Sequence, residues 1–478
     1  MSPNSILTAG EAALRCARDR PDSIAVVWRK RRHCYRDLAA HIAGFARGLE
    51  GRSITQGMMV AVACEDRYLR LVLAFALEVI GAAAAHLAPS AATSDRALEH
   101  CDVLLADRMD LTPPAGIRCV PITPDVVREI THAPVSPADL GRLARARGEE
   151  EVAFLGSTSA TTGGKKFFYE TWAGVCSQIR LIGQMYFQPP VTDLISLYDL
   201  TVGAAYVAAV AALNRGGCIV FSTLQAFPAE AQQRPHAHAP LLLRDVELLS
   251  RMHAEAPFHC CIDSVRVLGA ALPLANRRWL ETTLANRVVN SYSANETGQI
   301  AESTADGRCL VYPGVEVKIL AADGSERPAG ETGFISVKSP QNTLAYLDEP
   351  ELSARHFRNG WFLSNDLGRM TGPGVLELLG RDDDVLNVGG IKLAPATWEQ
   401  SIKQIDGVLD CVLLAHGDTV VVCIEQPATA PRAALRRRIT AELKASLGDV
   451  KVAFFDRFPR TETGKVQRRM MGVKDDST

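Results

Sequence analysis

Small hydroxyl residues, glycines and lysines are concentrated in one stretch of the chain, residues 156–166, which reads Gly-Ser-Thr-Ser-Ala-Thr-Thr-Gly-Gly-Lys-Lys. The stretch follows the short apolar run from Val152 to Leu155, which predicts a buried strand. A loop of this composition can turn its backbone N–H groups toward an anion, and its ammonium groups can balance the anion's charge. The stretch therefore predicts a loop that binds polyphosphate.

Of two other interpretations of this loop, one stays open on composition alone. The Walker pattern requires glycine where Ser159 stands and serine or threonine where Lys166 stands, so the loop is not a Walker loop. A flexible, solvated turn between a strand and a helix would have the same composition and no function. The residues further along the chain decide between these alternatives.

Composition limits the class of protein that can carry such a loop. A chain of 478 residues that is 47% hydrophobic predicts a soluble globular protein of two to four domains. A net charge of −2 gives no electrostatic reason to expect nucleic acid or an anionic membrane as a partner. The apolar stretch from Leu71 to Leu87 is interrupted by Glu78 and His86, so we expect no membrane span. Twelve cysteines without a C-x-x-C pair predict reduced thiols and a cytoplasmic location.

The first 150 residues alternate between strand and helix patterns. Strands are predicted over residues 24–28, 58–63 and 103–105, and a helix over residues 35–49. This alternation is typical of an α/β fold with a parallel sheet covered on both faces by helices. Residues 108–148 carry several prolines and are expected to form a surface connection.

Polar residues follow several later strands at the edge where α/β sheets bind ligands. Asp199 ends the predicted strand 194–198 and is expected either to face the substrate or to cap the next helix. Gly269 follows the predicted strand 265–268. Residues 291–298 are expected to form a turn after the strand 287–290, in which Tyr292 offers a face for an adenine ring and Glu296 a carboxylate for magnesium.

Together these segments resemble a known superfamily, the adenylate-forming enzymes, which comprises acyl- and aryl-CoA synthetases, carrier-protein-loading adenylation domains and luciferases. The loop is similar to the family's Ser-Gly-Thr-Thr-Gly-x-Pro-Lys-Gly signature. The matching positions are Ser159, Thr161, Thr162, Gly163 and Lys166. Ala160, Lys165 and Phe167 replace the family's usual Gly, Pro and Gly, which puts the loop's stiffness and charge in doubt.

Four more segments resemble the family's motifs in the family's order. Tyr292 and Glu296 match its Tyr-Gly-x-Thr-Glu motif. Residues 360–368 resemble Gly-Trp-x-x-Thr-Gly-Asp-Leu-Gly, which places Asp366 on the ribose hydroxyls. Residues 380–392 resemble the hinge segment, with Arg381 near the ribose and phosphates and Asp383 at the pivot. Residues 460–465 resemble Pro-x-Thr-x-x-Gly-Lys, which makes Lys465 the lysine that completes the adenylation site.

The resemblance implies a reaction in two steps. A carboxylate attacks the α-phosphorus of ATP to form an acyl-adenylate, and a thiol then displaces AMP. Lys166 and magnesium on Glu296 would neutralise the phosphates, while Lys465 would bridge carboxylate and phosphate. The implied domains are residues 1–380, a hinge at 381–383, and a small mobile domain over 384–478. Its rotation would exchange Lys465 for Gly389 and Gly390, which would border the pantetheine tunnel.

The acyl acceptor is open between CoA and the phosphopantetheine of a carrier protein. The hinge segment after Asp383 is more similar to that of CoA synthetases, which favours CoA and a small carboxylic acid substrate. Tyr198 and Asp199 resemble the Phe-Asp-x-Ser segment of amino-acid-activating domains, which favours an amino acid and a carrier protein. A third alternative, from another class, is a catalytically weak nucleotide- or acyl-binding module, because the loop has lost three of its usual residues.

Overall fold

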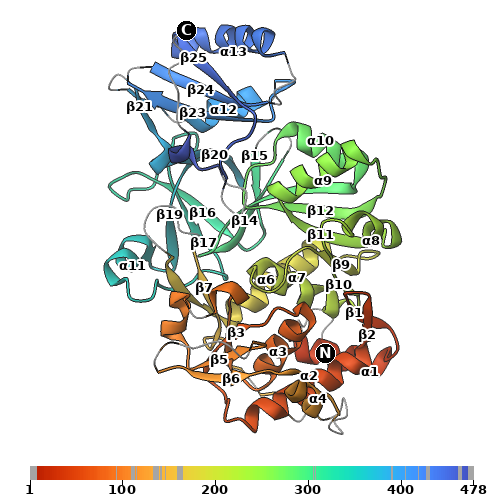
Figure 1. The fold of residues 1–478 in the computed structure, drawn as a ribbon. Helices are drawn as coiled ribbons and strands as arrows, with labels where there is room; N and C mark the ends of the chain where they lie inside the picture. Colours follow the sequence, from red (N-terminus) through yellow and green to blue (C-terminus); the bar gives the residue numbers. More distant parts are fainter. Residues whose placement is uncertain are drawn as a thin grey trace.

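The computed structural model describes residues 8–92, 94–108, 114, 116–132, 139, 141, 143–145, 147–158, 165–304, 306, 308–388, 391–393, 395–403, 405–417, 419–426, 431–460 and 466–471. Figure 1 shows an elongated molecule with the N-terminal elements at one end, sheet-rich parts in the middle and the C-terminal elements at the other end. The predicted class is confirmed: a large α/β region of parallel and mixed sheets with covering helices precedes a smaller α+β domain.

Helices are distributed over the whole described part of the chain. They are α1 (Ala9–Asp19), α2 (Tyr35–Glu50), α3 (Arg67–Val79), α4 (Pro124–His132), α6 (Trp172–Tyr186), α7 (Gly203–Asn214), α8 (Phe227–Gln233), α9 (Leu243–Glu255), α10 (Leu274–Thr283), α11 (Pro350–His356), α12 (Pro395–Lys403) and α13 (Arg432–Leu447). Helix α2 follows the pattern predicted over 35–49, and α6 and α7 cover the middle of the molecule.

One six-stranded sheet lies in the N-terminal part. Its strand order is β6 (Arg118–Pro121), β5 (Val103–Ala106), β3 (Met59–Ala63), β4 (Ala83–His86), β7 (Val152–Ser157) and β8 (Phe167–Thr171). All neighbours are parallel except β7 and β8, which are antiparallel. Ala84 packs into the core on one face of this sheet, whereas Ala83 and Ala85 pack on the other. Because both faces are covered, the first three residues of β4 are small and apolar.

A second sheet of fourteen strands in the described residues crosses the middle of the molecule. Its order is β16 (Glu316–Leu320), β17 (Gly333–Lys338), β19 (Trp361–Gly372), β20 (Val375–Arg381), β15 (Arg308–Val311), β14 (Gly298–Ser303), β13 (Ala285–Ala294), β12 (Ile262–Leu268), β11 (Ala237–Leu242), β9 (Asp193–Ser196), β10 (Ile219–Phe221), β1 (Ile24–Trp28) and β2 (Arg31–Cys34), with β18 (Phe357–Arg358) paired to β19. The strands from β13 to β1 are parallel, and those from β13 to β16 are antiparallel.

Several sequence-based predictions of these elements are wrong, each because a distant partner decides the pairing. The strand predicted over 24–28 does form, as β1, but residues 31 and 32 of the expected turn belong to its antiparallel partner β2, and its other neighbour is β10, nearly 200 residues later, rather than β3 or β5. The expected surface connection over 108–148 contains β6 and α4. The polyphosphate loop leads into strand β8 before the helix begins. The expected turn over 291–298 is mostly strand, since β13 continues to Ala294 against β14.

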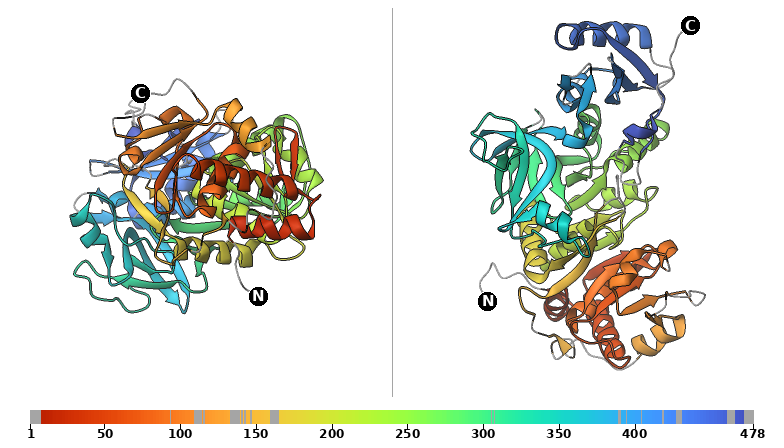
Figure 2. Two further views of the ribbon diagram at one scale, coloured as in Figure 1. Left: turned by 90° about the horizontal axis from the view of Figure 1, so that it is seen from below. Right: turned by 90° about the vertical axis from the view of Figure 1, so that its left-hand side faces the viewer.

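The C-terminal elements form a compact unit with its own core. Strands β23 (Asp410–His416), β24 (Thr419–Glu425) and β25 (Val450–Phe455) make one sheet, and β21 (Leu386–Val388) pairs with β22 (Ile391–Leu393). Residues of α12 and α13 pack on the sheet, and this core includes Ile402, Leu413, Ile424 and Ile439. The right-hand view of Figure 2 also shows this unit at one end of the molecule. The proposed boundaries at 380 and 384 remain a prediction.

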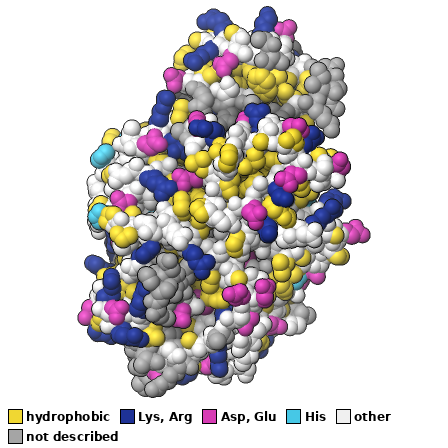
Figure 3. Space-filling model, turned by 180° about the vertical axis from the view of Figure 1, so that it is seen from behind, with side chains coloured by type: hydrophobic (Ala, Val, Ile, Leu, Met, Phe, Trp, Pro, Cys, Tyr) yellow, Lys and Arg dark blue, Asp and Glu magenta, His cyan; other side chains and the backbone are white. Residues whose placement is uncertain are grey.

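The described residues can be compared with what composition predicted about surface charge, membrane spans and cysteines. Figure 3 shows basic and acidic side chains interspersed over the face seen from behind. In the described residues, no helix is both long enough and apolar enough to cross a lipid bilayer. All twelve cysteines are free thiols.

Candidate active site

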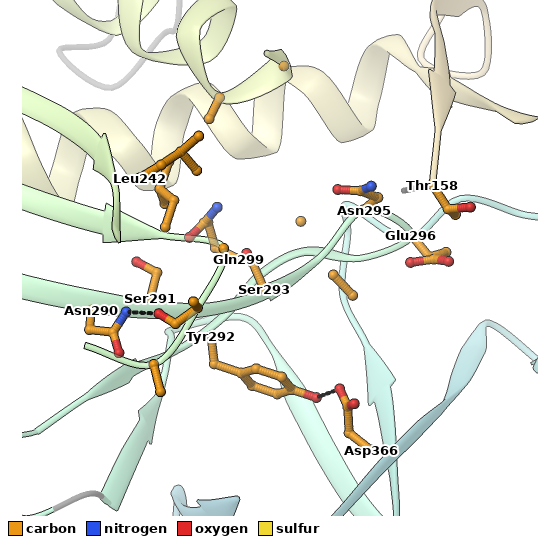
Figure 4. A pocket seen from close by; sticks show the side chains of 18 of the residues that line it. Thr158, Leu242, Asn290, Ser291, Tyr292, Ser293, Asn295, Glu296, Gln299 and Asp366 are labelled. Atoms are coloured by element: carbon orange, nitrogen blue, oxygen red, sulfur yellow. Dashed lines mark hydrogen bonds between the residues drawn. The ribbon is translucent and has the colours of Figure 1, made fainter. Parts of the chain in front are cut away.

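A cavity of about 990 Å³ lies between the two sheets and the C-terminal unit. Its wall includes six of the residues that the sequence predicted for nucleotide or metal binding: Lys166, Gly269, Tyr292, Glu296, Asp366 and Arg381. Figure 4 shows Tyr292 and Asp366 on one side of this space and Glu296, Asn295 and Thr158 on another. The described predictions therefore converge on one cavity, whose size suits a nucleotide and a small acid.

The phosphate-loop segment closes as a hairpin between β7 and β8. The backbone N–H of Thr158 donates to the carbonyl of Lys166 at 2.9 Å, and the N–H of Lys166 donates to the Thr158 hydroxyl at 3.3 Å. At the base of the hairpin, a Cβ on Gly156 would lie 2.4 Å from Cε2 of Phe168, so only glycine fits there. The loop residues predicted to bind phosphate, Ser159, Thr161, Thr162 and Gly163, lie outside the described residues.

Two of the departures from the family signature are accommodated structurally. The Lys165 ammonium lies 2.8 Å from the Asp95 carboxylate, which fixes it to the 3₁₀ turn η2 (Arg96–His100). Phe167 is the first residue of β8 and is buried in the core on the far face of that sheet. Neither side chain is among those that line the cavity, and both instead contact parts of the protein beside the loop.

Lys166, Tyr346 and Glu296 form a polar cluster on the cavity wall. The Tyr346 hydroxyl donates to Oε1 of Glu296 at 2.6 Å, and the Lys166 ammonium lies 5.3 Å from the centre of the Tyr346 ring. Burial, and next the neighbouring Glu296 carboxylate, raise the pKa of Tyr346, so it stays a hydrogen-bond donor. In the described residues, no group of three metal-binding side chains occurs. A magnesium ion would therefore be held by Glu296 together with nucleotide phosphates, and the single carboxylate fits that role.

Tyr292, Asp366 and Arg381 form a second cluster. The Tyr292 hydroxyl donates to Oδ2 of Asp366 at 2.6 Å, as Figure 4 shows, and Nε of Arg381 lies 3.8 Å from Oδ1. Asp366 and Arg381 are directly paired in register across β19 and β20. Burial, and next the charge of Asp366, raise the pKa of Tyr292. The carboxylate is thereby held in place by two strands, as a group that binds a sugar hydroxyl must be.

Gly269 follows β12 in the left-handed region, with φ of 83°. Asn290 fixes this corner, because its amide donates to the carbonyl of Ala270 at 2.9 Å and its oxygen accepts from the N–H of Leu272 at 3.0 Å. The backbone after β12 is therefore turned along the cavity wall by a conformation that favours glycine.

Tyr198 and Asp199 are placed beside the cavity rather than among the side chains that line it. The Tyr198 hydroxyl donates to Asp245 and accepts from the N–H of Leu242. Asp199 accepts from the backbone and hydroxyl of Thr201 at 2.9 and 2.6 Å, and its other oxygen lies 3.8 Å from the buried Arg70 guanidinium. Although burial opposes its ionisation, Arg70 and Thr201 lower the pKa of Asp199. This arrangement gives both side chains structural partners and does not favour contact with the acid.

The C-terminal unit closes one side of the cavity with charged side chains. The charged residues of this unit that line the cavity are Asp384, Glu399, Lys403, Asp410, Arg460 and Arg468. Arg460 lies 2.9 Å from Asp410 and 2.6 Å from Glu425 within the unit, and 3.6 Å from Glu247 of α9 in the large region. These contacts hold the Arg460 side chain between the C-terminal unit and α9.

Three further predictions about this unit are not decided by the structure. Lys465, Gly389 and Gly390 lie outside the described residues. Asp383, the expected pivot, is the middle residue of the 3₁₀ turn η3 (Asp382–Asp384), directly after β20 ends. Its position is where the chain leaves the large sheet, but a pivoting role stays a prediction.

Sequence reasoning missed Tyr346, Glu170 and His86, which all line the cavity. Tyr346 carries no motif and lies 50 residues from its partner Glu296. Glu170 follows the loop on β8, where burial raises the pKa of its carboxyl to about 7. His86 ends an otherwise small and apolar strand, and that single polar residue was the available signal.

The fold and the cavity define a class: an α/β enzyme that binds a nucleotide between a large region and a smaller C-terminal unit. Residues 14–347 match the family described as "AMP-binding enzyme". The chain belongs to this family of AMP-binding enzymes.

One of the relatives and the solved structure described below match almost the full chain, and a second relative matches less than half of it. The medium/long-chain-fatty-acid–[acyl-carrier-protein] ligase FadD10 of Mycobacterium tuberculosis is 24% identical over 96% of this chain and 93% of its own length. The benzoate–CoA ligase of Thauera aromatica is 27% identical over 42% of this chain and 41% of its own. The fold is similar to that of o-succinylbenzoate CoA synthetase (MenE) from Bacillus subtilis in complex with AMP, with a TM-score of 0.77, 19% identity, and coverage of 97% of this chain and 98% of that one.

Proposed function

We propose that this chain activates a small carboxylic acid with ATP and transfers the acyl group to a thiol, and that CoA is the acceptor. The observation that carries the proposal is the convergence of Lys166, Glu296, Tyr292, Asp366 and Arg381 on one cavity, from segments up to 215 residues apart in the sequence. In the first step a carboxylate oxygen attacks the α-phosphorus of ATP and pyrophosphate leaves. In the second the thiolate attacks the acyl carbon and AMP leaves.

Each residue has a physical task in the first step. Two anions must approach each other, so cations and N–H groups must offset their repulsion. The Lys166 ammonium supplies positive charge at the base of the phosphate loop, and the Asp366 carboxylate accepts hydrogen bonds from the ribose hydroxyls. Arg381, beside Asp366, adds positive charge toward the phosphates. Magnesium, when bound at Glu296, would supply further charge neutralisation on the phosphate oxygens.

The acceptor is proposed from the hinge segment, whose sequence is more similar to that of CoA synthetases. A second candidate, the phosphopantetheine of a carrier protein, is favoured by two relatives that span nearly the whole chain and are named as acyl-carrier-protein ligases. Comparing CoA with a phosphopantetheinylated carrier protein as the acceptor of a preformed acyl-adenylate separates the two. We also place the enzyme in the cytoplasm, which agrees with its twelve free thiols.

The test of the proposal is ATP–pyrophosphate exchange over a panel of fatty, aryl and amino acids. Exchange with at least one acid is expected, and Lys465→Ala should abolish it, because one such charge contact contributes about 2.7–4 kcal/mol, or roughly 10²–10³ in rate. The exposed Lys444 on α13 provides the control, since Lys444→Ala should leave exchange unchanged. If exchange proceeds undiminished in Lys465→Ala, that lysine has no part in the mechanism. If ATP binds but no acid supports exchange, the weak binding module is the better description.

A further inference from the structure

One end of the cavity is a chamber between the six-stranded sheet and two helices. His86 of β4, Phe154 of β7 and Glu170 of β8 line it from the sheet. Ala84 pairs with Phe154, and Phe154 pairs with Glu170, so these side chains project from the same face, and His86, two residues after Ala84, does too. Helices α6 and α7 close the chamber opposite, with Gln178 and Tyr206 among the lining residues.

The apolar part of this chamber is an aromatic wall. The Phe154 ring packs edge-on against Tyr206 with ring centres 4.6 Å apart, and the tilted His86 ring lies with its centre 5.8 Å from that of Phe154. The Tyr206 hydroxyl donates to the buried carboxyl of Glu78 on α3 and is therefore already paired. Tyr206 thus offers a ligand its ring rather than its hydroxyl.

The polar part of the chamber is incomplete. Both ring nitrogens of His86 are buried and have no hydrogen-bond partner among the described residues. Burial, and next the nearby Arg70 charge, lower the pKa of His86 to about 3, so the ring is neutral. A neutral imidazole carries one N–H donor and one acceptor nitrogen. Buried polar groups of this kind are almost always paired, so an unpaired pair of nitrogens on a cavity wall indicates a ligand that completes it.

A second polar group stands on the neighbouring strand. The Glu170 carboxyl accepts one hydrogen bond, from the Gln178 amide at 3.2 Å. The chamber therefore presents a hydrogen-bond donor and an acceptor on His86, the carboxyl oxygens of Glu170, and aromatic side chains between these two residues. An unsubstituted hydrocarbon chain would leave both His86 nitrogens buried and unpaired, whereas a hydroxyl group can either donate or accept and would pair with one of them.

We propose that the acid activated by this chain carries a hydroxyl group at the end remote from its carboxylate, and that His86 recognises this hydroxyl. The proposal rests on the proposed function, because the carboxylate must lie at Lys166 and Glu296 for adenylation. It is a statement about substrate class: a compact hydroxy acid rather than an unsubstituted fatty acid.

The register of the strands sets the scale of that acid. His86 is level with Gly156 of β7, because Ala84 pairs with Phe154. Gly156 is two residues before Thr158, where the phosphate loop begins, so His86 lies roughly 7 Å from the base of the loop along the strand direction. That span matches a short or single-ring carbon frame between the reacting carboxylate and the hydroxyl.

The first test compares matched acids in ATP–pyrophosphate exchange. The pairs are hexanoate and 6-hydroxyhexanoate, benzoate and 4-hydroxybenzoate, and 3-phenylpropanoate and its 4-hydroxyphenyl counterpart. The wild type should favour the hydroxylated member of at least one pair in kcat/KM on the order of 10- to 100-fold, the cost of leaving a buried polar group unpaired. His86→Phe, which keeps a ring and removes both nitrogens, should lose this preference, and His86→Gln should restore part of it.

His238 provides a matched control. It is also buried with an unpartnered Nε2, but its Nδ1 lies 2.8 Å from the Ser264 hydroxyl, and it is outside the described lining of the cavity. His238→Phe should keep the wild-type preference. Exchange without discrimination in any pair, or a preference that His86→Phe retains, would overturn the proposal while leaving the ligase function in place.

A binding measurement separates failure of the inference from failure of the function. In histidine-¹⁵N-labelled protein, the His86 ring signals, assigned by their loss in His86→Phe, should shift with a hydroxylated acid and not with its unsubstituted partner. A selective shift without exchange would retain the hydroxyl site and remove the ligase function. Exchange without any shift of the His86 signals would retain the ligase function and remove the hydroxyl site. The absence of both exchange and shift would remove both proposals.

Discussion

Glu170 provides a quantitative test of the cavity's electrostatics that does not depend on the substrate. Burial raises the pKa of its carboxyl from the usual 4.5 to about 7, and the hydrogen bond from Gln178 offsets only part of this effect. Because the folded protein holds this proton more tightly than the unfolded chain, stability should fall as the pH rises from about 4.5 to about 7, and change no further above that. The loss between pH 5 and pH 8 is about 2–3 kcal/mol.

The perturbation is Glu170→Gln, an isostere that cannot ionise and still accepts a hydrogen bond through its amide oxygen. Relative to wild type, this variant should be about 2–3 kcal/mol more stable at pH 8 than it is at pH 5. Urea titrations can be followed by tryptophan fluorescence, since the buried Trp172 lies two residues away. Glu65→Gln, at an exposed position, should show no such pH dependence. An equal effect of Glu170→Gln at both pH values would refute the reasoning.

Three smaller perturbations test other contacts. Tyr346→Phe removes the hydrogen bond to Glu296 and should raise the magnesium concentration needed for half-maximal exchange about 10- to 100-fold, with kcat at saturating magnesium changed less; an unchanged magnesium dependence would contradict this role. Asp95→Ala removes the ion pair with Lys165, so it should lower stability by up to about 1 kcal/mol and raise the KM for ATP. The control is the same mutation in a Lys165→Met background. An equal loss of stability in both backgrounds would show that the two side chains do not interact. Glu247→Ala removes the ion pair between α9 and Arg460 of the C-terminal unit, and it should speed proteolysis after residue 380 about fivefold. Identical cleavage rates in the variant and the wild type would show that this contact does not hold the C-terminal unit.

The charged groups of the candidate site could be predicted from sequence because their chemistry is local. A loop of small residues and lysines and a carboxylate after a strand each carry their own signal, and Lys166 and Glu296 were found in this way. Asp366 was predicted from the resemblance of residues 360–368 to a family motif, and the structure brings all three to one cavity. The predicted roles of Lys465 and Asp383 come from the same resemblance and stay predictions.

The sequence by itself determined the α/β class, a part of the strands and helices, and the identity of these charged residues, since periodicity and motif composition are properties of neighbouring residues. Only the tertiary structure decided which groups are partners. Tyr346 meets Glu296 across 50 residues, Asp199 turns to Arg70, and His86 is left with two buried, unpaired nitrogens on a cavity wall. Burial and pairing depend on distant strands coming together, so no local pattern encodes them.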